Sequence, residues 1–217
     1  MDFVPSCLRR AVIYLDQVII RNHVTKGNII MAKFKVAVIV GSNRRESINR
    51  RLAQALAKLG SAKADFSFVQ IDDLPLYNQD LDTALPKPVV RYKGELATAD
   101  AVLFVTPEHS RSIPAVLKNA IDWGARPWGQ NSWTDKVAAV AGASLGAIGT
   151  AIAQAHLKNI LLAQGTLVAG GEAYLTFKDG LIDDAGTITD EGTRKFLQGF
   201  VDQFIALAAR PAAAQAA

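Results

Sequence analysis

The sequence predicts an α/β fold in which a doubly wound, five-stranded parallel sheet is covered by helices on both faces. Short apolar runs alternate with longer amphipathic segments from residue 34 onward. The runs are continuously apolar, as in strands that are buried on both faces, and do not alternate with polar residues. A length of 217 residues suits one domain with a complete core.

The first half of this pattern contains two predicted strands and two predicted helices. "FKVAVIVG" (34–41) is uniformly apolar beyond its lysine and predicts a buried strand. "SINRRLAQALAKL" (47–59) repeats apolar residues at helical spacing and predicts an amphipathic helix. A second strand is expected over 65–72, and a helix over 88–99 after a proline-containing loop.

The second half repeats the alternation, with proline and glycine at the expected boundaries. Pro107 ends an apolar strand, Pro114 suits the first turn of a helix, and Gly165 suits a helix C-terminus. The predicted strands are 100–108, 136–144 and 166–171. The predicted helices are 114–123, 148–165 and 190–209.

The two ends of the chain differ from this regular part. Residues 1–30 show no clear period and precede a second methionine, Met31, so we expect an N-terminal extension outside the fold. Its apolar stretch is interrupted by Asp16 and lacks a small-residue cleavage site, which argues against a signal peptide. The predicted domain is 31–210, followed by a frayed tail at 211–217.

Composition and charge indicate which ligands, metal sites and cellular location are expected for this chain. The net charge is +4, and the basic residues are spread along the chain rather than concentrated, which argues against nucleic-acid binding and favours anionic small molecules. One cysteine excludes an internal disulfide, and three distant histidines predict no metal site. No apolar run approaches the roughly 20 residues of a membrane span, so a soluble cytoplasmic protein is expected.

The loop after the first strand, 41–49, is the first candidate binding site, because ligands bind at the carboxyl ends of parallel strands. Its helix N-terminus attracts anions, and Ser42, Arg44, Ser47 and Asn49 add donors that suit a terminal phosphate. It matches neither the Walker A nor the GxGxxG pattern. An ordinary turn in which Ser47 caps the helix remains the alternative.

Two further loops could accommodate a flat ring. The segment after Thr106 offers backbone groups that could bind a heteroaromatic edge, although Glu108 could equally be an ordinary loop carboxylate. Nothing in the sequence orients His109 for acid–base chemistry. The loop 141–150 is rich in glycine around Ser144, which would let a ring approach the backbone, but such turns are common.

Four segments together resemble the NADPH-dependent FMN reductase family, which includes bacterial chromate and quinone reductases. They are "GSNRRESINRRLAQAL", "LPLYNQDLD", "TPEHSRSIPAVLKNAIDW" and "GASLGAIGTAIAQAHLKNIL", and the resemblance extends from about residue 33 to 204. It implies a flavodoxin-like fold with strand order 2-1-3-4-5. It also implies FMN as cofactor and NADPH or NADH as reductant.

The resemblance assigns roles residue by residue. The positions expected to hold the FMN phosphate are Ser42, Arg44, Ser47, Ile48 and Asn49, whereas Arg50 and Arg51 are expected on a solvated helix face. The positions expected to surround the ring are Pro107, Glu108, His109, Ser110, Gly142, Ser144 and Gly146. His109 and Ser110 stand where the family commonly has Tyr and Asn, which puts substrate stacking in doubt. Arg111 and Arg126 are expected to steer the phosphates of NADPH.

The resemblance also implies a mechanism and an assembly. FMN would accept a hydride from NAD(P)H and then reduce a quinone by two electrons, with chromate, azo or nitro compounds as incidental acceptors, and no catalytic side chain is required. A homodimer or homotetramer that uses helix 114–123 and Trp128 is expected. Two alternatives stay open, a flavodoxin-type one-electron carrier, although such carriers are usually acidic, and a nucleotide-binding protein without flavin.

Overall fold

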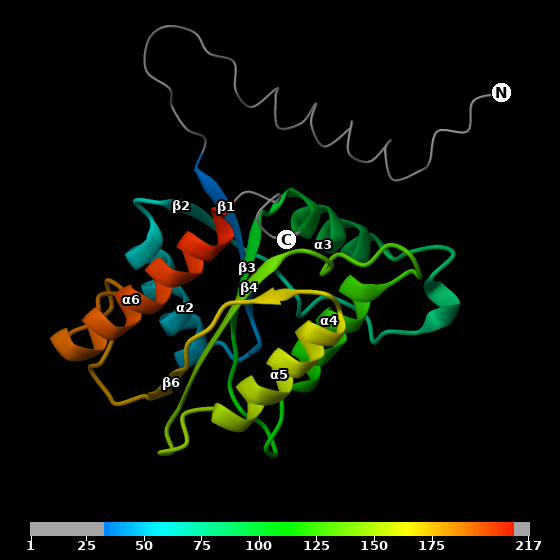
Figure 1. Cartoon of the computed structure of the whole chain (residues 1–217). Helices are drawn as coiled ribbons and strands as arrows, with labels where there is room; N and C mark the ends of the chain where they lie inside the picture. The colour runs from blue at the N-terminus through cyan, green and yellow to red at the C-terminus, as the bar shows by residue number, and fades with distance from the viewer. Residues whose placement is uncertain (1–32, 211–217) are drawn as a thin grey trace, which may run out of the picture. The chain divides into compact units, whose positions relative to one another are not determined.

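The computed structural model describes residues 33–210, and the predicted extension at 1–30 and the tail at 211–217 lie outside this range. Strands and helices alternate along it, as Figure 1 shows. The strands are β1 (Phe34–Val40), β2 (Ala64–Phe68), β3 (Ala101–Val105), β4 (Val137–Ser144), β5 (Leu167–Val168) and β6 (Ala173–Thr176). The helices are α2 (Ile48–Gly60), the short 3-10 helix η1 (Gln79–Leu81), α3 (Lys87–Thr98), α4 (Ala115–Ala125), α5 (Ala151–Ala163) and α6 (Glu191–Ala208).

The strands form one parallel sheet in the order β2-β1-β3-β4-β5, which confirms the predicted order. β1 lies between β2 and β3, with Val38 opposite both Phe68 and Leu103. Since β1, β3 and β4 are almost completely buried, their continuous apolar sequences match a sheet that is covered on both faces.

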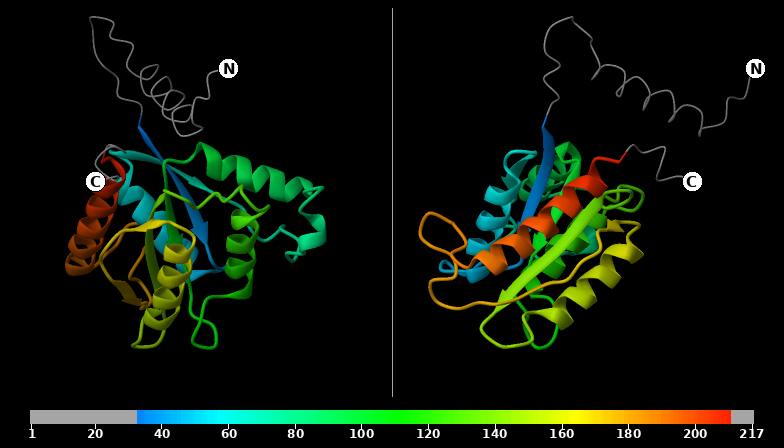
Figure 2. Two further views of the ribbon diagram at one scale, coloured as in Figure 1. Left: turned by 45° about the vertical axis from the view of Figure 1, so that its right-hand side comes forward. Right: turned by 60° about the vertical axis from the view of Figure 1, so that its left-hand side comes forward.

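Helices cover the two faces unequally. One face packs against α2 and α6, and the other packs against α3, α4 and α5 (Figures 1 and 2). The connection after β1 therefore leads to the first face, whereas the connections after β2, β3 and β4 lead to the second. This divergence places crevices beside β1 at the carboxyl edge of the sheet.

The fifth position of the sheet differs from the prediction. The predicted strand 166–171 is reduced to the two residues of β5, and β6 pairs separately with the carboxyl half of β4. Gly171 has a φ of 100°, a conformation that favours glycine, and it separates the two short strands. Helix α5 also begins later than predicted, at Ala151, because Gly149 and Thr150 adopt left-handed conformations.

In the described residues, no helix combines the length and the apolar character that crossing a membrane requires.

Candidate active site

Three loops meet where β1, β3 and β4 end, and they contain the predicted cofactor-binding residues. Hydrogen bonds continue the sheet up to the start of these loops, from Gly41 N–H to Val105 O at 2.8 Å and from Thr106 N–H to Ala141 O at 3.0 Å. In Figure 1 the loops after β3 and β4 lie together at the lower end of the sheet. The predicted residues of loops 41–49, 106–112 and 142–146 are therefore neighbours.

The loop after β1 ends in a capped helix. The Ser47 side chain is buried and accepts a hydrogen bond from Arg50 N–H at 3.3 Å, so Ser47 is the N-cap of α2, as the simpler interpretation expected. The backbone N–H groups of Ile48 and Asn49 have no acceptor among the described residues. These free donors at a helix N-terminus can bind an anion.

The Asn49 side chain joins α2 to β4 and faces away from solvent. Its Nδ2 donates to Ala143 O at 2.9 Å, and Ala143 N–H donates to its Oδ1 at 2.8 Å. Asn49 is only 2% exposed. The amide therefore positions the first turn of α2 against the sheet, and only its backbone N–H is free for a phosphate.

The arginines of this region fall into two groups. Within the described residues, Arg44, Arg45 and Arg50 have no ion-pair partner and no side-chain hydrogen bond. Arg51 instead donates to the carbonyl of Ile182 and lies over the ring of Phe177. The expectation that Arg51 belongs to a solvated face is wrong, because α2 packs there against the segment after β6.

Glu108 connects two of the loops. Its Oε2 accepts hydrogen bonds from the backbone N–H groups of Ile152 and Ala153, both at 3.1 Å, at the start of α5. Its Oε1 accepts from Arg111 at 3.0 Å, and its side chain is 8% exposed. Burial raises the pKa of the carboxyl, but the hydrogen bonds from the two backbone groups and from Arg111 lower it by more, so the pKa lies below its ordinary value.

The loop that follows Glu108 forms a tight reverse turn. His109 and Ser112 exchange backbone hydrogen bonds of 3.0 and 2.9 Å, and between them Ser110 and Arg111 have φ values of 49° and 62°. Non-glycine residues with positive φ are uncommon and often occur where a ligand is bound. Ser112 Oγ also lies 3.1 Å from His156 Nδ1 on α5, so the turn is held at both ends.

The loop after β4 is shaped by close internal packing. A Cβ atom at Gly142 would lie 2.2 Å from Thr106 O and 2.3 Å from Thr150 Oγ1. Gly142 is therefore required for the close contact between β3, β4 and the start of α5, and the expectation that it borders the ring stays a prediction. Ser144 Oγ donates to Gly146 O at 3.0 Å, and both residues lie at the accessible end of the strand.

Arg126 does not lie with the other predicted residues. It follows α4, whose 11 residues extend about 16 Å away from the loop after β3. Its guanidinium pairs with Asp82 at 2.8 Å and lies over the Tyr77 ring. Arg126 thus anchors the loop after β2 to the end of α4, and its expected part in steering the phosphates of NADPH stays a prediction.

Three residues that shape the site, Thr106, Thr150 and His156, were not predicted as site residues from the sequence. Thr106 and Thr150 are buried and pack against Gly142, and His156 contacts the turn after Glu108. The only sequence evidence for these contacts was the position of Thr106 at the end of an apolar run. Thr150 and His156 approach the site through the left-handed start of α5, which the glycine-rich sequence did not reveal.

Comparison with known proteins decides the family. The profile of the NADPH-dependent FMN reductase family matches residues 34–179, most of the described chain. This chain belongs to that family. FMN reductases of this family are flavoenzymes, and the resemblance stated from the four sequence segments is confirmed.

Two relatives and one solved structure are similar to this chain over most of its length. A 2-hydroxy-1,4-benzoquinone reductase from Burkholderia is 49% identical over 79% of this chain and 94% of its own length. A quinone reductase from Pseudomonas putida is 46% identical over 79% and 92%. Among solved structures, the FerB NAD(P)H:(acceptor) oxidoreductase of Paracoccus denitrificans superposes with a TM-score of 0.79 at 49% identity, covering 81% of this chain and 97% of FerB. The chain is therefore an oxidoreductase that uses FMN and NAD(P)H.

The residues present suit FMN. Backbone donors and the guanidinium of Arg44, all without a partner within residues 33–210, lie together at the start of α2 and match a phosphate monoester. The turn at 109–112 exposes backbone beside the accessible end of β4. The two halves of the site thus correspond to the charged and the flat ends of the cofactor.

Proposed function

We propose that this chain is an NAD(P)H:quinone oxidoreductase with FMN bound across the loops after β1, β3 and β4. The observation that favours this most is the junction of a phosphate-type anion site with a strained backbone turn at one edge of the sheet. The names of the two curated relatives, both quinone reductases, support a quinone as acceptor.

In this proposal the phosphate of FMN binds at the start of α2. Arg44 and the hydroxyl of Ser42 would contact its oxygens, together with the backbone N–H groups of Ile48 and Asn49. Ser47 and the Asn49 side chain act as positioning groups, since both are already engaged within the protein. The two backbone donors are fixed by α2 before the cofactor arrives, which lowers the entropic cost of binding.

The ring would lie between the turn at 107–110 and the end of β4. Pro107, His109 and Ser110 would present backbone groups to its polar edge, and Ser144 and Gly146 would border its other side. Glu108 holds the turn in place from α5 and does not need to contact the ring. The exposed His109 side chain would then contact the substrate that lies over the ring.

The chemistry itself belongs to the cofactor. When bound, FMN supplies a ring that accepts a hydride from NAD(P)H and delivers two electrons to an acceptor. The protein binds and orients this ring, keeps one face accessible, and tunes it through backbone donors. No side chain of the chain is required as a nucleophile.

Finer properties belong to the same proposal. We infer a cytoplasmic enzyme, since one cysteine per chain gives no internal disulfide, with chromate as an incidental acceptor. A homodimer or homotetramer is favoured by two large exposed apolar side chains, Trp128 at 88% and Leu76 at 81% exposure. The molar mass in solution, measured by light scattering, tests the assembly.

The decisive experiment is anaerobic. Protein loaded with FMN should lose its flavin absorbance near 450 nm on addition of about one equivalent of NADPH, and benzoquinone should restore it, as two-electron chemistry requires. Failure of NADPH to bleach the flavin unless a separate reductase is added would support the one-electron carrier instead. A protein that binds no FMN would favour the nucleotide-binding alternative.

A further inference from the structure

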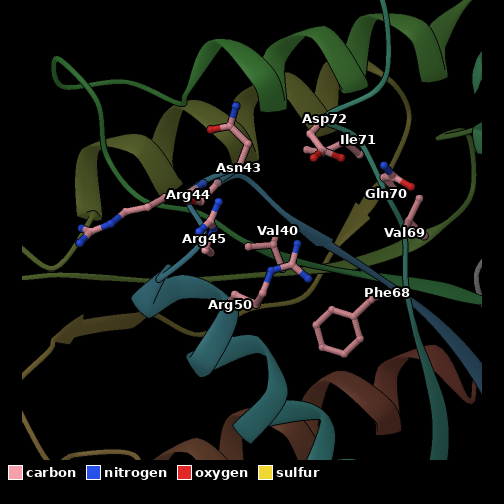
Figure 3. Close-up of a pocket in the computed structure, with 11 residues that line it drawn as sticks. Val40, Asn43, Arg44, Arg45, Arg50, Phe68, Val69, Gln70, Ile71 and Asp72 are labelled. Carbon is pink, nitrogen blue, oxygen red and sulfur yellow. Dashed lines mark hydrogen bonds between the residues drawn. The ribbon is translucent and has the colours of Figure 1, made fainter.

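A second hollow lies beside β1, on the side away from the ring-binding loops. It has a volume of about 410 Å³, within the range of roughly 300–1,000 Å³ that is usual for ligand sites. The loop after β1 forms one wall, which includes the Ser42 and Arg44 proposed to bind the FMN phosphate. The segment from Phe68, the last residue of β2, to Asp72 forms the other wall (Figure 3). We call it the β1/β2 crevice.

The topology of the sheet explains this crevice. The chain leaves β1 toward α2 on one face and leaves β2 toward α3 on the opposite face. Neighbouring strands whose connections diverge leave an opening between their carboxyl ends, where α/β proteins bind ligands. The divergence between β1 and β3 produces the FMN site, and the divergence between β1 and β2 produces the β1/β2 crevice.

Two arginines that line the crevice, Arg45 and Arg50, have no ion-pair partner among the described residues. Figure 3 shows the Arg50 side chain directed between Val40 and Phe68, whereas Arg44 extends away from Phe68. Arg45 and Arg50 also border another hollow of about 490 Å³, beside Glu46 and Asp184, which is not lined by any aromatic ring.

The wall opposite the arginines can contact the base and the ribose of a nucleotide. Phe68 is 40% exposed, so its ring can contact a planar base, and Ile71 and Val69 add apolar surface. Asp72 lies at the end of this wall, where a carboxylate can accept a hydrogen bond from the 3′-hydroxyl of a ribose. In α/β folds a carboxylate accepts the ribose 2′-hydroxyl of NAD, whereas an arginine accommodates the 2′-phosphate of NADP.

We propose that the β1/β2 crevice binds the adenosine half of NADPH, with Arg45 and Arg50 contacting its 2′-phosphate. The inference rests on the proposed oxidation of NAD(P)H and names the residues that recognise the coenzyme. It replaces Arg111 and Arg126, because Glu108 and Asp82 already neutralise those two. β2 and β3 lie two strand spacings apart, about 10 Å, which an extended dinucleotide spans to reach the ring site.

The test uses adenosine 2′,5′-bisphosphate and calorimetry on the FMN-loaded protein, so binding is measured without turnover. Arg45→Ala and Arg50→Ala should each weaken binding about 10-fold, the loss expected for one charge-assisted contact. The matched control is Arg194→Ala on α6, which removes an arginine that pairs with Glu191 and should leave binding unchanged. In steady-state assays, Arg50→Ala should raise KM for NADPH about 10-fold with little change in kcat, and KM for NADH much less.

Three results would overturn the inference while the proposed function stands. The first is turnover of NADPH with an unchanged KM in both Arg45→Ala and Arg50→Ala. The second is equal binding of the bisphosphate by these two variants and by Arg194→Ala. The third is binding of inorganic pyrophosphate as strong as that of the bisphosphate, which would indicate a general anion site. Absence of NADPH oxidation by the unmutated protein would instead contradict the proposed function. Bisphosphate binding that depends on Arg45 and Arg50 would then still support a nucleotide site.

Discussion

At the scale of single residues, the arginines near the site differ in whether another group of the protein already contacts their guanidinium. Arg51, Arg111 and Arg126 are engaged by a carbonyl or a carboxylate, whereas Arg44 and Arg50 have no side-chain partner among the described residues. Sequence position alone cannot make this distinction for Arg51 and Arg126, because their partners Ile182 and Asp82 lie far away in the sequence, whereas Glu108 is only three residues from Arg111. Contacts made over such distances depend on the tertiary fold.

We expect Arg44→Ala to weaken FMN binding by about 1–3 kcal/mol, the range for a hydrogen bond to a charged group. Fluorescence titration of the apoprotein with FMN measures the change. The variant Arg194→Ala, in the first turn of α6, removes the same charge and should bind FMN normally. Equal affinities in wild-type and Arg44→Ala protein would show that the phosphate lies elsewhere.

Glu108 should make stability depend on pH. Its pKa is lowered in the folded protein, so its stabilising contribution is complete above the unfolded-state pKa and is lost as the pH falls through the folded-state pKa. Glu108→Gln should therefore lower the free energy of unfolding by about 1–3 kcal/mol near neutral pH, and this difference should shrink under acid conditions.

Urea denaturation of both proteins across this pH range provides the measurement. Glu191→Gln is a suitable comparison, because Glu191 is exposed and pairs with Arg194 at the surface, where ion pairs contribute little. A stability difference for Glu108→Gln that stays constant from neutral to acid pH would contradict the role assigned to the carboxylate.

At the scale of elements, the sequence predicted the order of strands and helices and most of their boundaries. Apolar runs and turn residues are local, and they identify β1, β3 and β4 well. The split into β5 and β6 was missed, because it depends on Gly171 and on pairing with β4. The sequence also predicted the loops that follow β1, β3 and β4, but the direction of each side chain was not predictable.

A substitution at Gly142 tests how closely β3, β4 and α5 must pack. Gly142→Ala would place a methyl group against the Thr106 carbonyl, and we expect a loss of stability of about 1–3 kcal/mol from overpacking. Gly170→Ala is the matched control, since no heavy atom lies within 4 Å of its added Cβ. Thermal unfolding of both variants should show a decrease for Gly142→Ala only, and similar melting temperatures would refute the packing argument.

At the scale of the whole molecule, the regular α/β pattern begins near residue 33, and the family profile begins at residue 34. We therefore expect a chain that starts at Met31 to fold and to bind FMN with the affinity of the full-length protein. Circular dichroism and FMN titration of the two proteins measure this. Loss of folding on truncation would show that residues 1–30 belong to the domain.

The division of the last sheet position between β5 and β6 also affects how the protein behaves at high concentration. Long, regular edge strands expose unpaired backbone groups on which other chains can assemble, and this is a common route to fibrils. Here that edge consists of segments of two and four residues, interrupted by Gly170 and Gly171. An incoming strand would meet no continuous row of donors and acceptors, so the interruption protects the protein against edge-to-edge aggregation.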